Sequence, residues 1–483
     1  MKIVLLNPPH KFKYCRASRW PESTKSGTLY YPYWLAYATG VLMETEHEPI
    51  LIDAIAKEWG FQKTIDEVVK LSPDLVVIDT STPSITNDVK FIEQFKEFSE
   101  TKLILVGTHP TVLPEQTLSM SESIDFIARK EYEYTIPDLA NTLENNGNLK
   151  NVLGIYFKKD KKIVRNPDRP LIKDLDALPF VSKVYKKFLN VYDYRYAQLR
   201  HPMIQVVSSR SCPCMCTFCN VPLRFLSHEL RIRSVENFVD ELEWIVENIP
   251  EIKEIFIEDD TFTINKKRVV EVCNSMIERN LKIIWSTNAR ADIPYDVLQK
   301  MKYAGCRMVI VGYESGVQRI LNNVKKGVTI KQAEEFTKNA KRAGIKVFGS
   351  FMIGLPGDTK ETIEQTLKFA KKLDPDTIQI QQAVPFPETE FYEWCQKNGY
   401  LLTNDFSKWL DENGQLNFIV SYPNLSAEEL KRMRDKLMIN FYTSPRHIAS
   451  TIVNNLNPFE IKRLTKASFT YLSFLLRRRL ANL

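Results

Sequence analysis

Two regions of the chain alternate short apolar runs with helix-like segments, and this rhythm constrains the fold more than any other feature. In the first region the apolar runs are KIVLLN (2–7), PILIDA (49–54), DLVVIDT (74–80), KLILVG (102–107) and DFIARK (125–130). Strands that are apolar along their whole length and alternate with helices are typical of a parallel sheet covered on both faces. We therefore predict a doubly wound α/β domain over residues 1–145, with ligands at the carboxyl ends of its strands.

The same rhythm returns after residue 200. Six further strands are expected at 203–208, 253–259, 282–287, 307–312, 346–354 and 376–381. A helical segment follows each of the first five, and six consecutive units of this kind predict a partial (β/α)6 barrel over residues 201–385. Residues 146–200 are interpreted as a linker that contains a β-hairpin, and residues 386–483 as a helical C-terminal region.

Composition limits the classes of protein that fit. The 483 residues carry a net charge of only +7, with basic and acidic side chains interspersed, so no nucleic-acid partner is expected. The N-terminal run MKIVLLNPPH is too short for a signal peptide, and the uncharged stretch 26–43 is a poor candidate to span a bilayer. We expect a cytoplasmic protein, in which clustered cysteines are more often metal ligands or redox groups than disulfides.

The segment SRSCPCMCTFCN (209–220) contains four of the eight cysteines, namely Cys212, Cys214, Cys216 and Cys219. A structural zinc site usually takes two CxxC pairs, and here only one is present, with His228 as a possible fourth ligand at an unusual spacing. A thioredoxin-like dithiol is another alternative, but it leaves Cys212 without a role. The spacing Cys212-xxx-Cys216-xx-Cys219 favours three thiolates that hold three irons of a [4Fe–4S] cluster, with the fourth iron open. Cys214 is then predicted to be a bystander in the loop.

This spacing, with the aromatic Phe218 just before the last cysteine, resembles the radical SAM superfamily. The resemblance implies that Cys212, Cys216 and Cys219 ligate the cluster, and that the open iron chelates the amino and carboxylate groups of S-adenosylmethionine. It also implies the chemistry: one electron from the cluster cleaves the sulfonium, and the resulting 5′-deoxyadenosyl radical removes hydrogen from an unactivated carbon.

Polar or turn-forming residues end the next strands of the predicted barrel, which is where barrel active sites gather. They are Glu258, Asp259 and Asp260, then Asn288 and Arg290, then Glu314 and Ser315, and last Gly354 and Pro356. The resemblance implies that these residues and Phe218 surround S-adenosylmethionine, with the acidic segment near its amino group, Glu314 at the ribose and the GLPG turn near the adenine. Structural alternatives remain, because Asp259 or Asp260 can cap a helix and Arg290 can pair locally with Asp292.

A doubly wound domain ahead of such a barrel resembles the cobalamin-binding radical SAM enzymes. The motifs GTHPTVLPEQ, FIEDDTF, NARAD, VGYESG and FMIGLPGDT are most similar to the group that contains the anaerobic magnesium-protoporphyrin ester cyclase and hopanoid-modifying enzymes, among them one that contracts a cyclitol ring. The resemblance implies a cobalamin site at the strand ends of the front domain, with the candidate residues Asn7, Pro8, Thr80, Ser81, Thr82, Gly107 and His109. The chain lacks the Asp-x-His-x-x-Gly motif, so cobalamin would bind without a histidine from it. The alternative is a domain of the same fold that holds no cobalamin.

These expectations describe a radical SAM enzyme that acts on a lipophilic small molecule and takes electrons from a donor such as flavodoxin or ferredoxin. Methylation through cobalamin, oxidative cyclisation and rearrangement remain open. The competing class is a non-catalytic zinc or redox module on an α/β scaffold. The tail from Lys462 onward is basic and amphipathic, which predicts either peripheral contact with an anionic membrane or a helix that covers the barrel.

Overall fold

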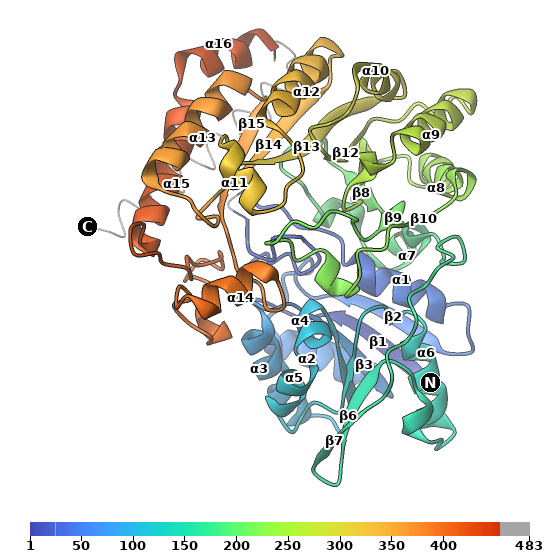
Figure 1. Cartoon of the computed structure of the whole chain (residues 1–483). Helices are drawn as coiled ribbons and strands as arrows, with labels where there is room; N and C mark the ends of the chain where they lie inside the picture. The colour runs from blue at the N-terminus through green and yellow to red at the C-terminus, as the bar shows by residue number, and fades with distance from the viewer. Residues whose placement is uncertain (25, 455–483) are drawn as a thin grey trace.

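The computed structural model describes residues 1–24 and 26–454 and contains two large sheets, each at the centre of an α/β domain. The first sheet and its helices occupy the lower half of Figure 1, and the second sheet occupies the upper half. The first sheet has the strand order β2-β1-β3-β4-β5-β6-β7. Its five parallel strands are β1 (Lys2–Asn7), β2 (Glu48–Asp53), β3 (Leu75–Thr80), β4 (Lys102–Gly107) and β5 (Phe126–Ala128). The strand order reverses between β1 and β3, and the crevice at such a point is where doubly wound sheets bind ligands.

Alternate residues of each strand in this sheet enter two different cores. Ile3 and Leu5 belong to one core and Val4 and Leu6 to the other, because successive side chains of a strand point to opposite faces. The first core includes α1 (Tyr33–Leu42) and α6 (Thr135–Glu144), and the second includes α2 (Phe61–Lys70), α3 (Ile85–Lys96) and α5 (Pro114–Ser119). The short helix α4 (Thr108–Val112) follows β4 directly. Both faces are therefore covered, and the predicted doubly wound domain is confirmed.

The predicted hairpin is present as β6 (Ile155–Lys159) and β7 (Lys162–Arg165), and it extends the first sheet. Strand β6 pairs antiparallel with β5, with Phe157 opposite Phe126. The sequence analysis placed this hairpin in a linker, because an alternating pattern predicts a pair of strands without saying which sheet edge they join. The domain boundaries at residues 145, 200 and 385 stay predictions.

The second sheet is parallel throughout, with the order β15-β14-β13-β12-β11-β8. Its strands are β8 (Met203–Val206), β11 (Glu254–Ile257), β12 (Trp285–Ala289), β13 (Cys306–Glu314), β14 (Lys346–Ile353) and β15 (Thr377–Gln382). Each strand pairs with its neighbour in sequence, so the strands follow one another around an open barrel with β8 and β15 at its edges. The predicted six-stranded partial barrel is confirmed.

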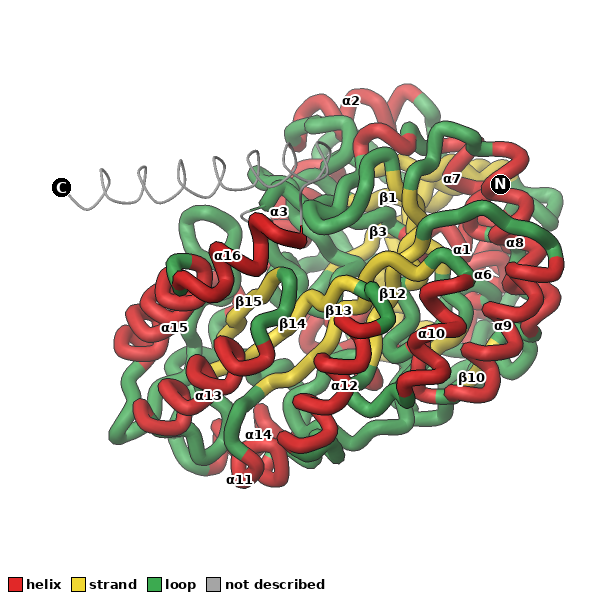
Figure 2. Tube along the Cα trace, turned by 90° about the horizontal axis from the view of Figure 1, so that it is seen from above, coloured by secondary structure: helices red, strands yellow, loops and turns green. Residues whose placement is uncertain are grey.

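Helices cover the outside of this barrel, as the view from above shows for α10, α12 and α13 (Figure 2). The helices of this domain are α8 (Val235–Asn248), α9 (Lys266–Glu278), α10 (Tyr295–Tyr303), α11 (Gln318–Asn323), α12 (Ile330–Arg342) and α13 (Lys360–Leu373). The short strands β9 (Ser209–Arg210) and β10 (Arg231–Ile232) form a two-stranded ribbon beside it, and α7 (Val181–Phe188) precedes β8.

The C-terminal region adds α14 (Glu390–Lys397), α15 (Ala427–Tyr442) and α16 (Pro445–Asn454). Helix α15 lies along the edge strand β15, where the Tyr442 hydroxyl donates to the Ile378 carbonyl at 2.8 Å. The predicted basic tail from Lys462 lies outside the described residues. Among the residues that the structure describes, no helix combines the length and apolar character needed to cross a membrane.

A long loop, residues 8–32, connects β1 to α1 and reaches the second domain. Its Tyr31 hydroxyl donates to the Met203 carbonyl on β8 at 2.9 Å, and its Tyr31 backbone N–H donates to Gln205 Oε1 at 2.9 Å. Connections of this kind usually take about two to six residues, and much longer ones tend to carry function.

A buried cluster of ion pairs also joins the two domains. Arg210 of β9 contacts Glu131 Oε1 at 2.6 Å and Glu133 Oε1 at 2.7 Å, and Arg231 of β10 contacts Glu131 Oε2 at 2.7 Å. The Arg210 guanidinium also lies 5.0 Å from the ring centre of Trp34. This cluster fixes the strand that leads into the cysteine loop against the front domain.

Candidate active site

The cysteine loop begins two residues after β9, at the carboxyl edge of the barrel. Cys212 Sγ lies 3.6 Å from the Thr261 hydroxyl, which follows β11, and Cys216 Sγ lies 3.9 Å from the Lys325 carbonyl, which follows α11. All four cysteines of the loop line one large cavity. The loop therefore presents its thiols where the barrel strands end, as predicted.

The four thiols differ in how readily they lose a proton. A hydrogen bond with the Cys214 thiol lowers the pKa of Cys212 to about 5, and the same contact raises the pKa of Cys214. Burial raises the pKa of Cys216, and it raises that of Cys219 to about 12. Because only a thiolate binds iron, metal binding by Cys216 and Cys219 has to displace a proton from each.

Cys214 has a partner that the other three cysteines lack. Arg290, which follows β12, donates from Nη1 to Cys214 Sγ at 2.9 Å, and its Nη2 donates to the Lys326 and Gly327 carbonyls at 3.2 and 3.1 Å. Arg290 Nε also lies 3.5 Å from Asp292 Oδ2, so the local pairing named as an alternative is present as well. The bystander role of Cys214 stays a prediction.

Among the described residues, no three His, Cys, Asp or Glu side chains converge on one point in the way that a single metal ion requires. A four-iron cluster makes a different demand, because each thiolate binds a different iron. Three soft thiols on the wall of a roomy cavity match that demand in chemistry and in access.

The cavity has a volume of about 1090 Å³ and is walled by the ends of the barrel strands, the loop after β1 and helices α15 and α16. Six of the residues predicted to surround S-adenosylmethionine line it, namely Phe218, Glu258, Asp260, Asn288, Arg290 and Glu314. Glu314 forms an ion pair with Lys326 at 2.7 Å, and both side chains face this space. The structure thus brings most of the predicted set together around the cysteines.

Four members of that set lie outside the cavity wall and have structural contacts. Asp259 accepts hydrogen bonds from the backbone and hydroxyl groups of Ser208 and Ser209, which ties β11 to β8. The Ser315 hydroxyl lies 3.2 Å from that of Thr366. The Gly354 and Pro356 carbonyls accept from Tyr422 and Asn323 at 2.6 and 3.0 Å. The sequence places these residues at strand ends, but it does not show which way each one faces.

Glu258 and Asp260 form an acidic pair beside the cysteines, and Arg19 of the front domain lies between them. Arg19 Nε is 3.9 Å from Glu258 Oε1, and Nη2 is 4.0 Å from Asp260 Oδ1 and donates to the Asp259 carbonyl at 2.5 Å. Burial raises the pKa of Glu258 from 4.5 to about 8 and that of Asp260 to about 6, although Arg19 opposes both shifts. Glu258 is therefore protonated at neutral pH in the metal-free protein.

Replacing this buried acid is expected to change how stability depends on pH. Between pH 4.5 and about 8 the folded protein holds a proton on Glu258 that the unfolded chain has lost, so the free energy of unfolding falls as pH rises. Glu258→Gln removes this pH dependence. The free energy of unfolding of the variant should therefore exceed that of the parent near pH 8, and the two values should be closer near pH 5. Urea unfolding of the metal-free proteins at these pH values measures the difference, and parallel pH profiles would contradict the assignment.

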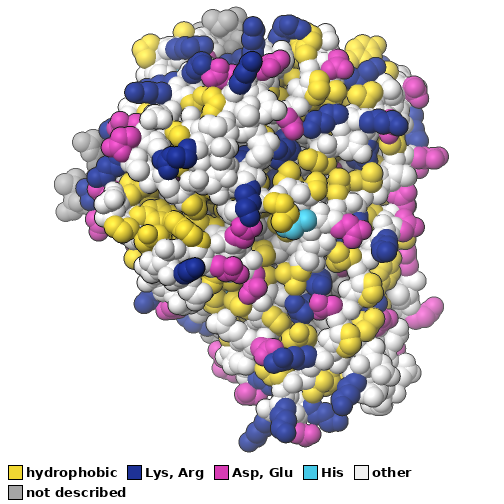
Figure 3. All heavy atoms as spheres, viewed as in Figure 1, with side chains coloured by type: hydrophobic (Ala, Val, Ile, Leu, Met, Phe, Trp, Pro, Cys, Tyr) yellow, Lys and Arg dark blue, Asp and Glu magenta, His cyan; other side chains and the backbone are white. Residues whose placement is uncertain are grey.

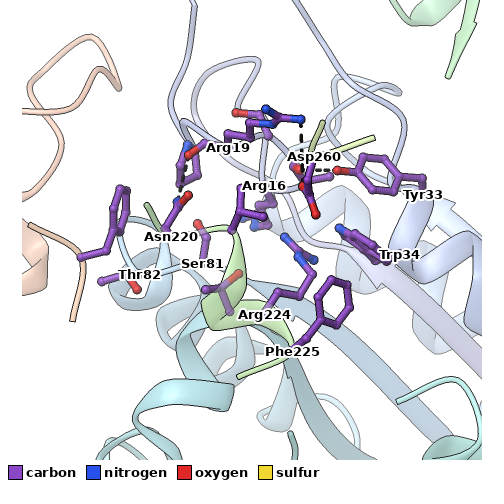
Figure 4. Close-up of a pocket in the computed structure, with 16 residues that line it drawn as sticks. Arg16, Arg19, Tyr33, Trp34, Ser81, Thr82, Asn220, Arg224, Phe225 and Asp260 are labelled. Atoms are coloured by element: carbon purple, nitrogen blue, oxygen red, sulfur yellow. Dashed lines mark hydrogen bonds and ion pairs between the residues drawn. The ribbon is translucent and has the colours of Figure 1, made fainter. Parts of the chain in front are cut away.

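A second, smaller cleft lies between the front domain and the cysteine loop (Figure 4). The front domain contributes Ser81, Thr82 and Thr108 from the ends of β3 and β4, and the segment after the cysteines contributes Asn220, Val221, Arg224 and Phe225. Its free volume is about 30 Å³, room for little more than a water molecule. It shares five wall residues with the large cavity, namely Ser18, Arg19, Asn220, Val221 and Asp260.

Of the residues predicted to hold cobalamin, Ser81 and Thr82 line this cleft. Asn7, Pro8 and Thr80 are instead tied to a buried ion pair between Arg16 and Asp88, and Gly107 forms the turn into α4 with a φ of +112°. His109 Nδ1 lies 3.2 Å from the Thr82 hydroxyl, its ring packs edge-on against Phe406, and burial lowers its pKa to about 3. His109 lines neither the cleft nor the large cavity.

The cleft fits cobalamin in the chemistry of its walls, which offer hydroxyl groups and N–H donors to a ligand rich in amides. It does not fit in volume as it stands, because the corrin ring needs space that only the adjoining cavity provides. The five shared residues form the partition that would have to move. The hydrogen bond from Asn220 Nδ2 to the Arg19 carbonyl, 2.9 Å long, is one contact that holds this partition.

Several cavity residues were not identified from the sequence. They are Arg19 and Glu22 in the loop after β1, Lys326 after α11, and Gln379 and Gln381 on β15. The length of the first loop was the available signal, since a connection of that length in a doubly wound domain calls for an explanation. The alternation of polar residues in TIQIQQ was another, because it places Gln379 and Gln381 on one face of β15.

Comparison with known families supports both halves of this arrangement. The sequence profile of the radical SAM superfamily matches residues 206–370, and that of the B12 binding domain matches residues 23–140. An uncharacterized methyltransferase of Pyrococcus horikoshii is 33% identical over 469 residues, covering 96% of this chain and 97% of the relative. The anaerobic magnesium-protoporphyrin IX monomethyl ester cyclase of Rubrivivax gelatinosus is 27% identical, covering 91% of this chain and 77% of the relative.

A solved structure shares the fold over nearly the whole chain. The radical S-adenosylmethionine methyltransferase TsrM from Kitasatospora setae, determined with cobalamin and a [4Fe–4S] cluster, superposes with a TM-score of 0.73 and covers 98% of this chain and 99% of that one. The two sequences are 14% identical, so this likeness concerns the arrangement of the two domains and not the chemistry of individual residues.

Proposed function

Since the chain belongs to the radical SAM superfamily and carries a B12-binding domain ahead of its barrel, we propose that it is a methyltransferase that alkylates an unactivated carbon of a lipophilic small molecule. The predicted family and its three cofactors, a [4Fe–4S] cluster, S-adenosylmethionine and cobalamin, are confirmed. When bound, the cluster supplies the electron that breaks a carbon–sulfur bond of S-adenosylmethionine, and the radical formed takes hydrogen from the substrate. An external electron donor is required, and we propose a flavodoxin or a ferredoxin.

One observation carries the methyltransferase proposal: the cleft between the domains and the cavity that contains the cysteines share a wall. Arg19 and Asp260 face both spaces, so a group carried in the cleft is one side-chain layer away from the cavity. The cleft as it stands is too small for a corrin, so its walls as well as this partition would have to move before a methyl donor held there could reach a substrate carbon. The names of the curated relatives, several of them methyltransferases, agree with this proposal.

The residues around the cavity take separate roles in this proposal. Cys212, Cys216 and Cys219 hold the cluster, while Asn288, Arg290 and Glu314 line the space for S-adenosylmethionine. The remaining wall is mostly apolar, with Ile310, Phe348, Met352, Ile380, Met438 and Ile439 among its members. Such a wall excludes water from a reactive radical and favours a lipophilic substrate.

Part of the surface of the molecule is apolar, as Figure 3 shows for one face. Hydrophobic side chains gather in the middle of this face, while positive and negative side chains are interspersed over the rest. Ile439 and Ile448, which line the cavity from α15 and α16, are 43% and 46% exposed. Whether the basic tail brings this region to a membrane stays a prediction.

Methyl transfer can be tested without the substrate. Anaerobic protein holding reduced cobalamin and the cluster, supplied with S-adenosylmethionine labelled with ¹³C in its methyl group, is expected to move the label onto cobalamin and to release an equal amount of S-adenosylhomocysteine. Mass spectrometry of the extracted cobalamin measures the label. A protein that forms 5′-deoxyadenosine but leaves cobalamin unlabelled would contradict the methyltransferase proposal and favour oxidative cyclisation, the reaction named for the Rubrivivax relative.

A further inference from the structure

The large cavity extends through the barrel from the carboxyl ends of its strands to their amino ends. At the carboxyl ends it is walled by the cysteine loop. At the amino ends Gln198 lines it, and the Gln198 carbonyl accepts from Arg307 near the start of β13 at 2.6 Å. Asp376 also lines it there, and its Oδ2 accepts from the Val347 N–H near the start of β14 at 2.9 Å. The six residues of β15 span about 20 Å, so the cavity is an elongated space of about that length.

The wall that the last two strands give to this cavity is polar. Strand β15 alternates between partly accessible and buried residues, and Gln379 and Gln381 belong to the accessible set that lines the cavity. Ser350 of β14 pairs in register with Gln379 and lines the cavity as well. Barrel interiors are usually filled by branched apolar side chains, so three polar side chains on one inner wall call for an explanation. We refer to Ser350, Gln379 and Gln381 as the polar strip.

Each glutamine of the polar strip is held through one end of its amide. Gln379 Nε2 donates to Ser350 Oγ at 3.0 Å, and Gln381 Nε2 donates to Glu22 Oε1 in the loop after β1 at 3.4 Å. A carboxylate accepts hydrogen bonds and does not donate them, so the amide nitrogen of Gln381 has to face Glu22. Within the described part of the chain, neither Gln379 Oε1 nor Gln381 Oε1 accepts a hydrogen bond. The strip therefore leaves two acceptors beside the cavity.

A structural role accounts for one glutamine of the strip but not for the other. Glu22 Oε2 also accepts from the Leu416 N–H at 3.0 Å, so Gln381 helps to tie the loop after β1 and the C-terminal region to the edge strand β15. Gln379 bonds to Ser350 within the sheet and takes no part in this tie. A buried wall position with a free acceptor usually has a ligand or water as its partner. Gln379 is thus the residue of the strip that points most directly to a ligand.

This inference deepens the proposed function and rests on it. The cluster and S-adenosylmethionine take the end of the cavity at the cysteines, and the substrate takes the remaining length, whose wall also includes the apolar Ile310 and Phe348. Glu22, a charged side chain in contact with the strip, disfavours a carboxylate or phosphate there. We infer that the substrate is an elongated amphiphile without an anionic head, and that its hydroxyl or N–H group donates to Gln379 and Gln381 while its hydrocarbon part extends toward the cysteines.

Binding of three single-chain probes to the cofactor-loaded enzyme tests the inference. 1-Decanol carries a hydroxyl donor, decyl methyl ether carries an oxygen that accepts but does not donate, and decanoate carries an anionic head. Gln379→Leu keeps a similar volume without the amide, and it is expected to raise the Kd of 1-decanol about fivefold, the loss typical of one neutral hydrogen bond. The Kd of decyl methyl ether should stay at the parent value or fall, and decanoate should bind the parent more weakly than 1-decanol. Anaerobic equilibrium dialysis with ¹⁴C-labelled probes measures each Kd.

A matched control and a series of chain lengths accompany this test. Phe348→Leu removes apolar surface from the same wall without changing the strip, so it should weaken 1-decanol and decyl methyl ether by the same factor. Affinity from 1-hexanol to 1-decanol should rise about fourfold for each added methylene, because each one buries further apolar surface along the cavity. Iron content and cleavage of S-adenosylmethionine should stay at the parent level in Gln379→Leu, which shows that the variant is folded.

The outcomes separate this inference from the proposed function. A parent protein that binds none of the probes would overturn the inference together with the lipophilic substrate, while transfer of the labelled methyl group to cobalamin would still test the reaction. Equal Kd values of 1-decanol in the parent and in Gln379→Leu would overturn the polar strip alone. Tighter binding of decanoate than of 1-decanol would overturn the choice of head group, and affinity that stops rising at 1-hexanol would overturn the elongated shape.

Discussion

Cys216→Ala protein, reconstituted anaerobically with iron and sulfide, is expected to lose the four-iron absorbance and to cleave S-adenosylmethionine about 10³-fold more slowly or not at all. The reason is electronic: without a cluster no electron reaches the sulfonium, and no side chain of the cavity can replace that donor. The parent should hold about four irons per chain. Iron and zinc analysis together with the yield of 5′-deoxyadenosine measures the effect, and one zinc per chain with no iron would point to a structural zinc module.

The matched control for this experiment is Cys214→Ser. Cys214 lies in the same loop and lines the same cavity, but its thiol is engaged by Arg290 Nη1 at 2.9 Å. The variant keeps a group that accepts this hydrogen bond, so cluster content is expected to stay near that of the parent. Loss of the cluster in Cys214→Ser combined with its retention in Cys212→Ser would show that a different set of three cysteines binds the irons.

Arg210→Ala is expected to destabilise the protein by about 3–5 kcal/mol, because it leaves Glu131 and Glu133 buried without their shared partner. The Arg210, Glu131 and Glu133 side chains are at most 3% exposed. Burial works to raise the pKa of Glu131, but Arg210 and Arg231 outweigh it and hold that pKa below its ordinary value. Burial raises the pKa of Glu133 in spite of Arg210. Removing Arg210 therefore leaves Glu133 buried without a cation beside it and Glu131 with Arg231 alone.

The matched control is Arg279→Ala. Arg279 also contacts two acids, Asp240 at 2.5 Å and Glu243 at 3.0 Å, but those side chains are 46% and 39% exposed. Water replaces the lost partner there, so the cost should stay below about 1 kcal/mol. The midpoint of the first urea transition compares the two variants, since a chain of two domains need not unfold in one step. Equal midpoints for the two variants would contradict the role given to the buried cluster.

The positions of the strands and helices along the chain could be predicted because they depend on local pattern. A run such as LVVIDT predicts a buried strand from its own residues alone. Short right-handed connections predict that consecutive strands of the barrel pair with each other. The hairpin at 155–165 shows the limit of such reasoning. Its own pattern is clear, but its place at the edge of the first sheet depends on the exposed side of β5, which the pattern of the hairpin does not contain.

The candidate site likewise contains residues that the sequence identifies and residues whose orientation only the folded structure shows. Cys212, Cys216 and Cys219 are recognisable because the spacing of ligands within one loop is written in the sequence. Asp259 and Asp260 are neighbours in the sequence, yet one ties β11 to Ser208 and Ser209 and the other faces the cavity. Which carboxylate turns inward depends on how the backbone leaves the strand, and that is set by packing against β8 and Arg19.

By itself the sequence determined two α/β domains, their order and a loop with the ligands for a four-iron cluster, since each of these depends on residues close together in the chain. Only the tertiary structure decided that Arg19 lies between Glu258 and Asp260, about 240 positions away, and that Arg224 and Trp34 line one cleft. Contacts of this kind arise when two domains pack, because burial then forces distant polar groups to find partners or to remain available for a ligand.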